Sequence, residues 1–208
     1  MLGLLLAGGP FMFATLTLSI ITTGVFIWRA VVYWGTGRWN TDLLAEIRDH
    51  VSNSRMSRAI EACNMSQGAQ SKILKAALTR ADRSEKEIRR AVETVALEEI
   101  PKIRAGTIYL PQFSNLATLF GLIGTIHGLI IAFSGAGAET AATRQLYLSR
   151  GISVAFYNTF FGLIVATMSI IFYLVLLSKM TTMMAALEHG AAVLVDDILS
   201  LRTSRDGR

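Results

Sequence analysis

Charged side chains are absent from three long stretches of this 208-residue sequence, residues 1–28, 105–138 and 151–178. Each stretch is longer than the roughly 20 apolar residues that cross a bilayer as an α-helix. Lipid offers no partner to a free backbone amide, and the apolar runs are continuous rather than alternating, so each stretch must be spanned by a helix. The absences therefore predict an all-α membrane protein with three transmembrane helices, and they exclude a membrane β-barrel.

Cysteine and membrane-embedded charge are also scarce. Cys63 is the only cysteine, so a disulfide within the chain is excluded, and its polar neighbourhood offers no set of metal ligands. We expect no metal site and no cofactor. No Asp, Glu, Lys or Arg lies in the middle of an expected span. If the protein moves ions, a partner must therefore supply the carboxylate.

The expected spans lack the sets of catalytic residues that an intramembrane enzyme needs. Such an enzyme needs a nucleophile with a base, paired aspartates or an HExxH metal motif. Ser114, Ser153 and Ser169 have no histidine at a suitable depth other than His127, which would require contact between subunits. We expect no catalytic residues and no enzymatic activity.

The Lys and Arg residues are distributed unevenly between the expected loops. About fourteen of the 20 lie between residues 29 and 104, and four more follow residue 178. The positive-inside rule therefore makes both regions cytoplasmic, and their mixture with Asp and Glu argues against nucleic-acid binding. The expected organisation is a periplasmic N-terminus (1–9), transmembrane helix (10–34), cytoplasmic helical loop (35–108), transmembrane helix (109–133), periplasmic loop (134–149), transmembrane helix (150–178), and cytoplasmic C-terminal helix and tail (179–208).

The first span is expected to be retained rather than cleaved. No positive region precedes it, and its first basic residue, Arg29, follows the apolar run. The loop after it shows helical spacing, and Ser84 with Glu87 has the spacing of a capping box. The helix that begins there is expected to run without a break into the second span, with kinks at Pro101 and Pro111. The tail over residues 203–208 is expected to be frayed.

Small residues mark one side of the second span. Gly121, Gly124 and Gly128 recur at spacings of three and four, which lets another helix approach the backbone closely. Plain helix packing is the simplest interpretation of these glycines, and Gly162 of the third span receives the same assignment.

Polar residues in the spans are candidates for function. Thr118 and Thr125 are seven residues apart and share a helix face, although a lone membrane threonine usually bonds to its own helix. His127 points about 200° away from Thr125 at 100° per residue. A hydrogen bond to a neighbouring helix is its favoured role, and a proton relay is the alternative. Asn158 is a further candidate for a polar contact.

Two motifs resemble a known family. Residues 119–128 read LFGLIGTIHG and resemble the LGLLGTVxG signature of the MotA/TolQ/ExbB proton-channel family, and residues 159–166, TFFGLIVA, resemble its TxxGLxxAIP signature. The expected topology also matches. The chain is similar to TolQ and ExbB more than to flagellar MotA, because it lacks the long cytoplasmic extension of the latter.

The resemblance implies a cyclic pentamer around a dimer of a second protein, a TolR-, ExbD- or MotB-like chain with one membrane helix and an Asp. Such a complex sits in the bacterial inner membrane and is driven by H⁺ or Na⁺. Thr125 and Thr159 match the motif threonines that face the pore, and Thr118 shares their assignment to the ion pathway. Val154 departs from the pattern, because many ExbB and TolQ members have a glutamate there.

A different class of function is a passive oligomeric scaffold or a small-solute pore. It would keep the oligomer but would not need threonines that face an Asp-bearing helix. A neighbouring gene that encodes a single-span protein with a membrane Asp favours the motor, and its absence favours the scaffold.

The topology can be tested with single cysteines introduced at Asn53 and at Gly137. Because the charge asymmetry makes residues 35–108 cytoplasmic, a cysteine at position 53 should resist an impermeant thiol reagent in intact cells, whereas one at position 137 should react. Labelling in the reverse pattern would overturn the orientation.

Overall fold

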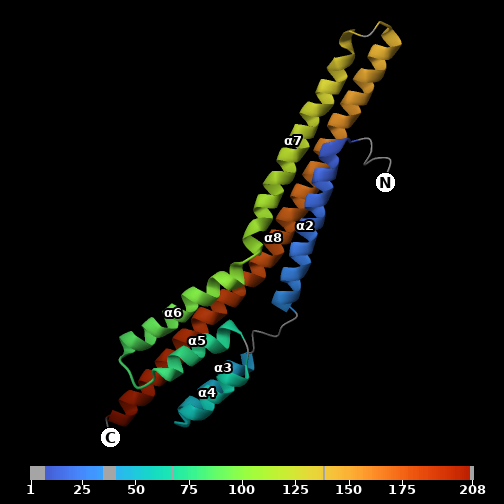
Figure 1. Cartoon of the computed structure of the whole chain (residues 1–208). Helices are drawn as coiled ribbons and strands as arrows, with labels where there is room; N and C mark the ends of the chain where they lie inside the picture. Colours follow the sequence, from blue (N-terminus) through green and yellow to red (C-terminus); the bar gives the residue numbers. More distant parts are fainter. Residues whose placement is uncertain (1–7, 35–40, 67, 138, 207–208) are drawn as a thin grey trace. The chain divides into compact units, whose positions relative to one another are not determined.

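The computed structural model describes residues 8–34, 41–66, 68–137 and 139–206, and within these ranges all regular structure is helical. The chain forms two compact units (Figure 1). The first comprises Met1–Ala30 and Gly106–Leu176, and the second comprises Val31–Ala105 and Leu177–Arg208. Each unit is described separately below.

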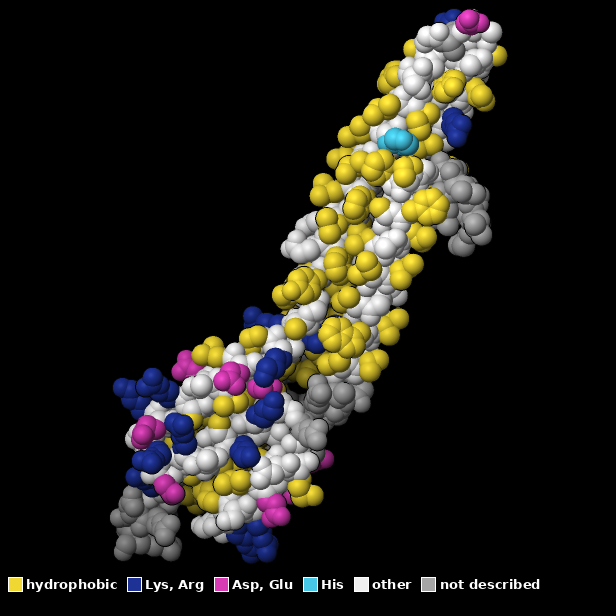
Figure 2. Space-filling view, in the orientation of Figure 1, with side chains coloured by type: hydrophobic (Ala, Val, Ile, Leu, Met, Phe, Trp, Pro, Cys, Tyr) yellow, Lys and Arg dark blue, Asp and Glu magenta, His cyan; other side chains and the backbone are white. Residues whose placement is uncertain are grey.

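The first unit is built from long apolar helices. Helix α2 spans Pro10–Trp34, α7 spans Leu110–Ser134, and α8 spans Ala141–Asp206, of which residues up to Leu176 belong here. Short 3₁₀ turns, η1 (Thr107–Tyr109) and η2 (Gly135–Gly137), flank α7. Three segments are long and apolar enough to cross a membrane, namely Pro10–Trp34, Thr107–Gly137 and Ala141–Thr203. Hydrophobic side chains dominate the visible surface of these helices (Figure 2).

The expected unbroken helix through Pro101 and Pro111 is wrong. Helix α6 ends at Arg104, and α7 begins at Leu110. Between them Gly106 has a φ of +81°, in the left-handed region that glycine adopts without a steric cost. Pro111 lies in the first turn of α7, where a missing N–H removes no helical hydrogen bond. The apolar stripe continues across this break, which is why periodicity alone did not reveal it.

Helix α8 is longer at both ends than the sequence pattern predicted. It begins at Ala141, so much of segment 134–149, assigned to a loop, is helical. It also continues to Asp206, so the expected fraying over residues 203–206 is not observed, while residues 207–208 lie outside the described residues. Between Ala141 and Asp206 the chain contains no proline, and therefore no residue that removes a backbone donor from the helix.

Helix α2 packs against the other two helices of the first unit through apolar contacts. Leu18 joins a buried cluster with Ala117 of α7 and Val165 of α8. Phe26 stacks on Phe172 of α8, with ring centroids 4.1 Å apart. These contacts cover one side of α2, while large apolar side chains such as Ile20 and Ile27 remain exposed.

The second unit consists of four short helices and the last part of α8. The helices are α3 (Thr41–Ser52), α4 (Met56–Met65), α5 (Ala69–Thr79) and α6 (Glu85–Arg104). The predicted capping box is confirmed: the Ser84 backbone N–H donates to Glu87 Oε2 at 3.1 Å, and the Ser84 side chain receives the N3 backbone N–H. Charged side chains gather on this unit (Figure 2).

One apolar core joins all five of these helices. Its buried side chains are Leu43, Ile47 and Val51 of α3, Ala59 and Cys63 of α4, Leu74, Ala77 and Leu78 of α5, Ile88 of α6, and Leu194, Val195 and Ile198 of α8. Burial raises the pKa of the Cys63 thiol to about 11, so this cysteine is a packed apolar side chain at neutral pH. The apolar side chains that give the loop its helical spacing therefore pack against the C-terminal part of α8.

A shielded carboxylate links α5 to α6. Glu99 has a side chain only 9% exposed, and its Oε1 accepts hydrogen bonds from Lys102 Nζ at 2.7 Å and Lys72 Nζ at 2.9 Å. These two donors, Lys102 first, lower the pKa of Glu99. The carboxylate therefore stabilises the fold above its unfolded-state pKa, and this contribution disappears as the pH falls through the lowered folded-state pKa.

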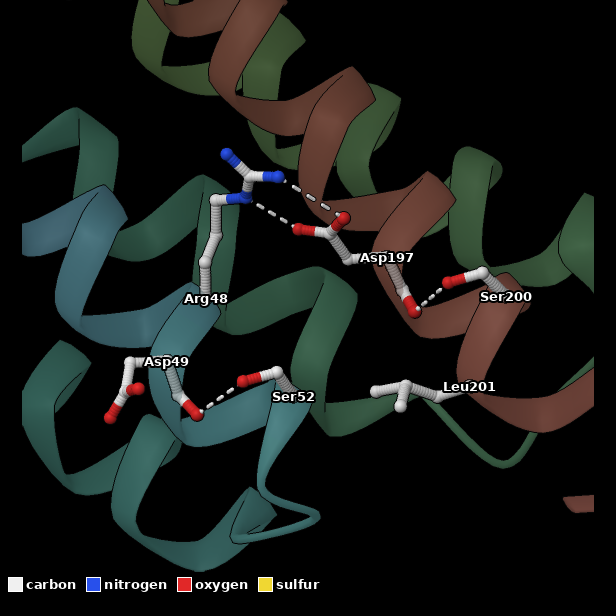
Figure 3. A pocket seen from close by; sticks show the side chains of 6 residues that line it. All are labelled: Arg48, Asp49, Ser52, Asp197, Ser200 and Leu201. Carbon is white, nitrogen blue, oxygen red and sulfur yellow. Dashed lines mark hydrogen bonds and ion pairs between the residues drawn. The ribbon is translucent and has the colours of Figure 1, made fainter. Parts of the chain in front are cut away.

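A second ion pair links α3 to α8. Arg48 Nε donates to Asp197 Oδ2 at 2.6 Å, and Arg48 Nη2 donates to Asp197 Oδ1 at 3.4 Å (Figure 3). Half of the Arg48 side chain is exposed, so solvent screens the pair and its contribution to stability is small. The pair lies in a hollow of about 320 Å³ lined also by Asp49, Ser52, Ser200 and Leu201.

The shared core predicts a contrast between two leucines. Leu194 is fully buried, whereas Leu97 on α6 is 69% exposed. Leu194→Ala should lower the free energy of unfolding by about 2–5 kcal/mol, because it removes buried methyl groups and leaves a cavity. Leu97→Ala should change it by less than about 0.5 kcal/mol. Thermal unfolding of both full-length variants in the same detergent measures the difference, and equal losses would contradict this account of the core.

Candidate ion-pathway site

The α7 and α8 backbones meet at a line of small residues, here called the glycine seam: Gly121, Gly124 and Gly128 of α7, and Gly162 of α8. A Cβ added at Gly128 would lie 2.5 Å from the Ala155 backbone nitrogen, and one at Gly162 would lie 2.9 Å from the Gly121 Cα. Real Cβ atoms do not approach other atoms so closely. The structure thus places all four glycines predicted to pack helices at the same helix contact.

Two serine hydroxyls bridge α7 and α8 in addition to the glycine seam. Ser114 Oγ donates to the Ala166 carbonyl at 3.0 Å, and Ser169 Oγ donates to the Leu110 carbonyl at 2.6 Å. Both serines are buried. In a low-dielectric interior, each such bond satisfies a group that would otherwise cost about 1–3 kcal/mol to leave unpaired. The sequence alone identifies these serines only as possible nucleophiles that lack a base, and their role in joining the two helices was missed.

Thr125 and Thr159 face each other across the contact between α7 and α8. Their Oγ1 atoms are in hydrogen-bonding contact, and both side chains are partly buried. Thr125 Oγ1 is also 3.0 Å from the Gly121 carbonyl, and Thr159 Oγ1 is 3.3 Å from the Ala155 carbonyl. The two hydroxyls have two protons to share among three contacts, which are the one between them and one to each carbonyl. Either hydroxyl can therefore donate to the other, and the pair can still accept a further hydrogen bond.

Thr118 is separate from this pair. Its Oγ1 donates to the Ser114 carbonyl of its own helix at 3.2 Å, and the residue is exposed. Leu122, between Thr118 and Thr125 on the same face, is 56% exposed. The three positions form an open strip along α7.

Asn158 is the most buried polar side chain of α8 in this region, with 1% exposure. Its Nδ2 donates to the Gly8 carbonyl at 2.7 Å and to the Val154 carbonyl at 2.8 Å. A Cβ at Gly124 would lie 2.4 Å from the Asn158 Cβ, so glycine there makes room for the amide. The polar contact predicted for Asn158 is thus made to the segment that leads into α2.

His127 lies on the side of α7 that faces α2. Its ring contacts Phe11 edge-on, with centroids 5.4 Å apart. Its Nδ1 is buried and has no hydrogen-bond partner among the described residues. The structure therefore keeps His127 apart from the Thr125–Thr159 pair, and the hydrogen bond to a neighbouring helix that we expected is not made by Nδ1.

The site presents neutral hydrogen-bonding groups and no formal charge. Residues 105–138 and 151–178 contain no Asp, Glu, Lys or Arg. Within the described part of the chain, no group of three or more His, Cys, Asp and Glu residues could hold a metal ion. Hydroxyl pairs of this kind can donate to a carboxylate or accept from a carboxylic acid, without the cost of burying a charge.

Comparison with known proteins identifies the family of the chain. The model of the MotA/TolQ/ExbB proton channel family matches residues 65–189, which is more than half of the chain and includes the glycine seam and the threonine pair. The chain belongs to this family, which is a family of channels rather than of enzymes.

Similar proteins are named for ExbB rather than for flagellar MotA. The chain is 30% identical over 199 residues to the biopolymer transport protein ExbB-like 1 of Synechocystis sp., covering 90% of the chain and 74% of that protein. It is 33% identical over 92 residues to biopolymer transport protein exbB1 of Vibrio cholerae, covering 44% of the chain and 40% of that protein. With the ExbB homolog of Methanothermobacter thermautotrophicus the identity is 29% over 126 residues, covering 60% of the chain and 43% of that protein.

The close packing at the glycine seam predicts that an added methyl group is harmful at Gly128 but tolerated at Gly24, which lies outside the seam. Gly128→Ala would push α7 away from α8, and it should destabilise the protein by about 1–3 kcal/mol, as overpacking does. Gly24→Ala on α2 is the matched control, because nothing lies within 4 Å of its added Cβ. It should be neutral or stabilise the helix by up to about 1 kcal/mol. Thermal unfolding midpoints in detergent compare the two, and a neutral Gly128→Ala would refute the close packing.

Proposed function

We propose that this chain is the stator subunit of an ion-driven motor in the bacterial inner membrane. In the proposed complex, five copies form a ring around a dimer of a TolR- or ExbD-like protein that has one membrane helix with an Asp. Flow of H⁺ or Na⁺ past that Asp drives the motion, which is transmitted to envelope or outer-membrane machinery. The names of the similar proteins, which refer to biopolymer transport, support this class of task.

The observation that carries the proposal is the contact between Thr125 and Thr159. These threonines come from the two separate family motifs, which are 34 residues apart, and their hydroxyls meet across α7 and α8. A lone membrane threonine usually bonds to its own helix, so a contact between two hydroxyls of different helices goes beyond that default. A pair of neutral groups beside a partner's carboxyl can stabilise both of its protonation states as an ion binds and leaves.

A carboxylate from outside the chain is needed for this mechanism. The apolar stretches contain no Asp or Glu, and Val154 occupies the position where many relatives have a glutamate. The carboxyl group at the depth of the threonine pair therefore has to come from the partner dimer. This requirement distinguishes the motor from a passive scaffold.

The proposed ring accounts for the uncovered surface of the spans. Thr118 is exposed, and so are large apolar residues on other faces of the same helix, including Ile123 and Ile130. Lipid suits the apolar side chains but not the hydroxyls, so a ring that turns the strip of Thr118 and Thr125 inward satisfies both. The positive-inside rule orients the N-terminus to the periplasm and the C-terminus to the cytoplasm.

Two substitutions at one position test the threonine pair. Thr159→Val keeps the shape but removes the hydroxyl, whereas Thr159→Ser keeps the hydroxyl and removes a methyl group. A hydrogen bond to a charged group contributes about 1.5–3 kcal/mol, so Thr159→Val should reduce ion-driven output by about ten- to a hundredfold. Thr159→Ser should retain a good part of it.

The controls are equal amounts of each variant in the membrane and an unchanged oligomer, expected to be a pentamer, by native mass spectrometry. If packing alone mattered, the order would be reversed, with Val tolerated and Ser harmful. An active Thr159→Val protein would refute the pore-lining role and leave a scaffold or small-solute pore as the alternative. Monomers alone in native mass spectrometry would refute the ring.

A further inference from the structure

Beside one turn of the first unit lie two buried polar atoms that have no hydrogen-bond partner among the described residues. They are Nδ1 of His127 on α7 and Oδ1 of Asn158 on α8. Buried polar groups in proteins are almost always paired with protein or with ordered water. Two such atoms in one place therefore indicate a ligand with complementary hydrogen-bonding groups.

The Asn158 amide can point in only one direction. Its nitrogen donates to the Gly8 and Val154 carbonyls. Turning the amide over would place its oxygen against those two carbonyl oxygens, and acceptors repel each other. The unpaired atom is therefore the oxygen, which can only accept a hydrogen bond.

The His127 ring reaches the same turn from α7. A Cβ added at Gly9 would lie 3.6 Å from His127 Cε1 and 3.8 Å from Nδ1. Gly9 directly follows Gly8, whose carbonyl holds Asn158, so the two unpaired atoms border neighbouring residues. Gly9 has a φ of +74°, which a side chain would strain. Glycine there is required by the backbone conformation, and it leaves the turn in contact with the ring edge.

The chemistry of these atoms selects the ligand. An anion is excluded, because Asn158 Oδ1 only accepts hydrogen bonds. A metal ion is disfavoured, because no carboxylate lies in the apolar stretches to balance its charge. A water molecule can donate to Asn158 Oδ1, and it can either donate to or accept from His127 Nδ1, depending on the tautomer.

We propose that His127 Nδ1 and Asn158 Oδ1 bind one water molecule where α2, α7 and α8 meet. This water completes a link from the Gly8–Gly9 turn through Asn158 to His127. It holds the start of α2 against the other two helices. The proposal does not rest on the motor function, because the same water would serve a passive scaffold.

The link also bears on the threonine pair. Asn158 and Thr159 are consecutive residues of α8, so an anchored Asn158 fixes the rotation of this helix about its axis. The direction in which Thr159 points is set by that rotation. Asn158 is thus a positioning residue for the hydroxyl that meets Thr125.

The test is a single-particle map of the full chain in lipid nanodiscs, at a resolution that shows ordered water. We expect a separate density peak at about 2.7–3.2 Å from both His127 Nδ1 and Asn158 Oδ1. A direct hydrogen bond between these two atoms, or no density beside either, would overturn the proposal.

Two variants of His127 make the assignment specific. His127→Phe keeps the ring against Phe11 but has no Nδ1, so the peak should disappear or lose its contact on α7. His127→Asn places a polar atom near the former Nδ1, so the peak should remain, with Thr125 and Thr159 still in contact. Persistence of an unchanged peak in a folded His127→Phe protein would show that His127 does not bind it. If His127→Phe does not fold, loss of the peak in His127→Asn would overturn the proposal.

Discussion

Close approach of the α7 and α8 backbones is the constraint on which the first unit depends. It requires residues without side chains at Gly121, Gly124, Gly128 and Gly162, since a Cβ at three of these would lie within 3.0 Å of the opposite helix. The approach brings the Ser114 and Ser169 hydroxyls within reach of carbonyls on the other helix. It also brings Thr125 into contact with Thr159. If an added methyl group pushed the two helices apart, the hydroxyls of Thr125 and Thr159 would no longer be in contact.

The two units are stabilised by different interactions because they are made of different side chains. The first has little charge, and several of its buried polar groups, such as Ser114 and Ser169, bond to a neighbouring helix. The second combines an apolar core, centred on residues such as Ile47, Ile88 and Leu194, with ion pairs at its surface. Among the described residues of this unit, Glu99 is the buried charged side chain, and two lysines pair with it. The match to the proton channel family, over residues 65–189, takes in parts of both units, while the second unit accounts for most of the charge.

Features that depend on neighbours in sequence could be predicted, and features that depend on distant partners could not. Continuous apolar runs identified the three candidate spans, and the spacing of Ser84 and Glu87 identified a helix start. The spacing of the glycines indicated a packing face on α7. In contrast, the hydrogen bond from Asn158 to Gly8 joins residues 150 positions apart, and no local pattern encodes it. The break at Gly106 was missed because the apolar stripe continues through it, whereas backbone dihedrals change there.

The absence of formal charge from the apolar stretches has an electrical consequence. A membrane potential does work on a protein in proportion to the charge that moves through it, about 2.3 kcal/mol per elementary charge for each 100 mV. Rearrangements of α2, α7 and α8 within the bilayer would displace no charged side chain from residues 1–28, 105–138 or 151–178. These apolar stretches therefore carry no formally charged side chain on which the membrane potential could act. In the proposed motor, voltage therefore acts on these stretches through the ion or the partner's carboxylate beside them, and their conformation responds to whether that position is occupied rather than directly to the field.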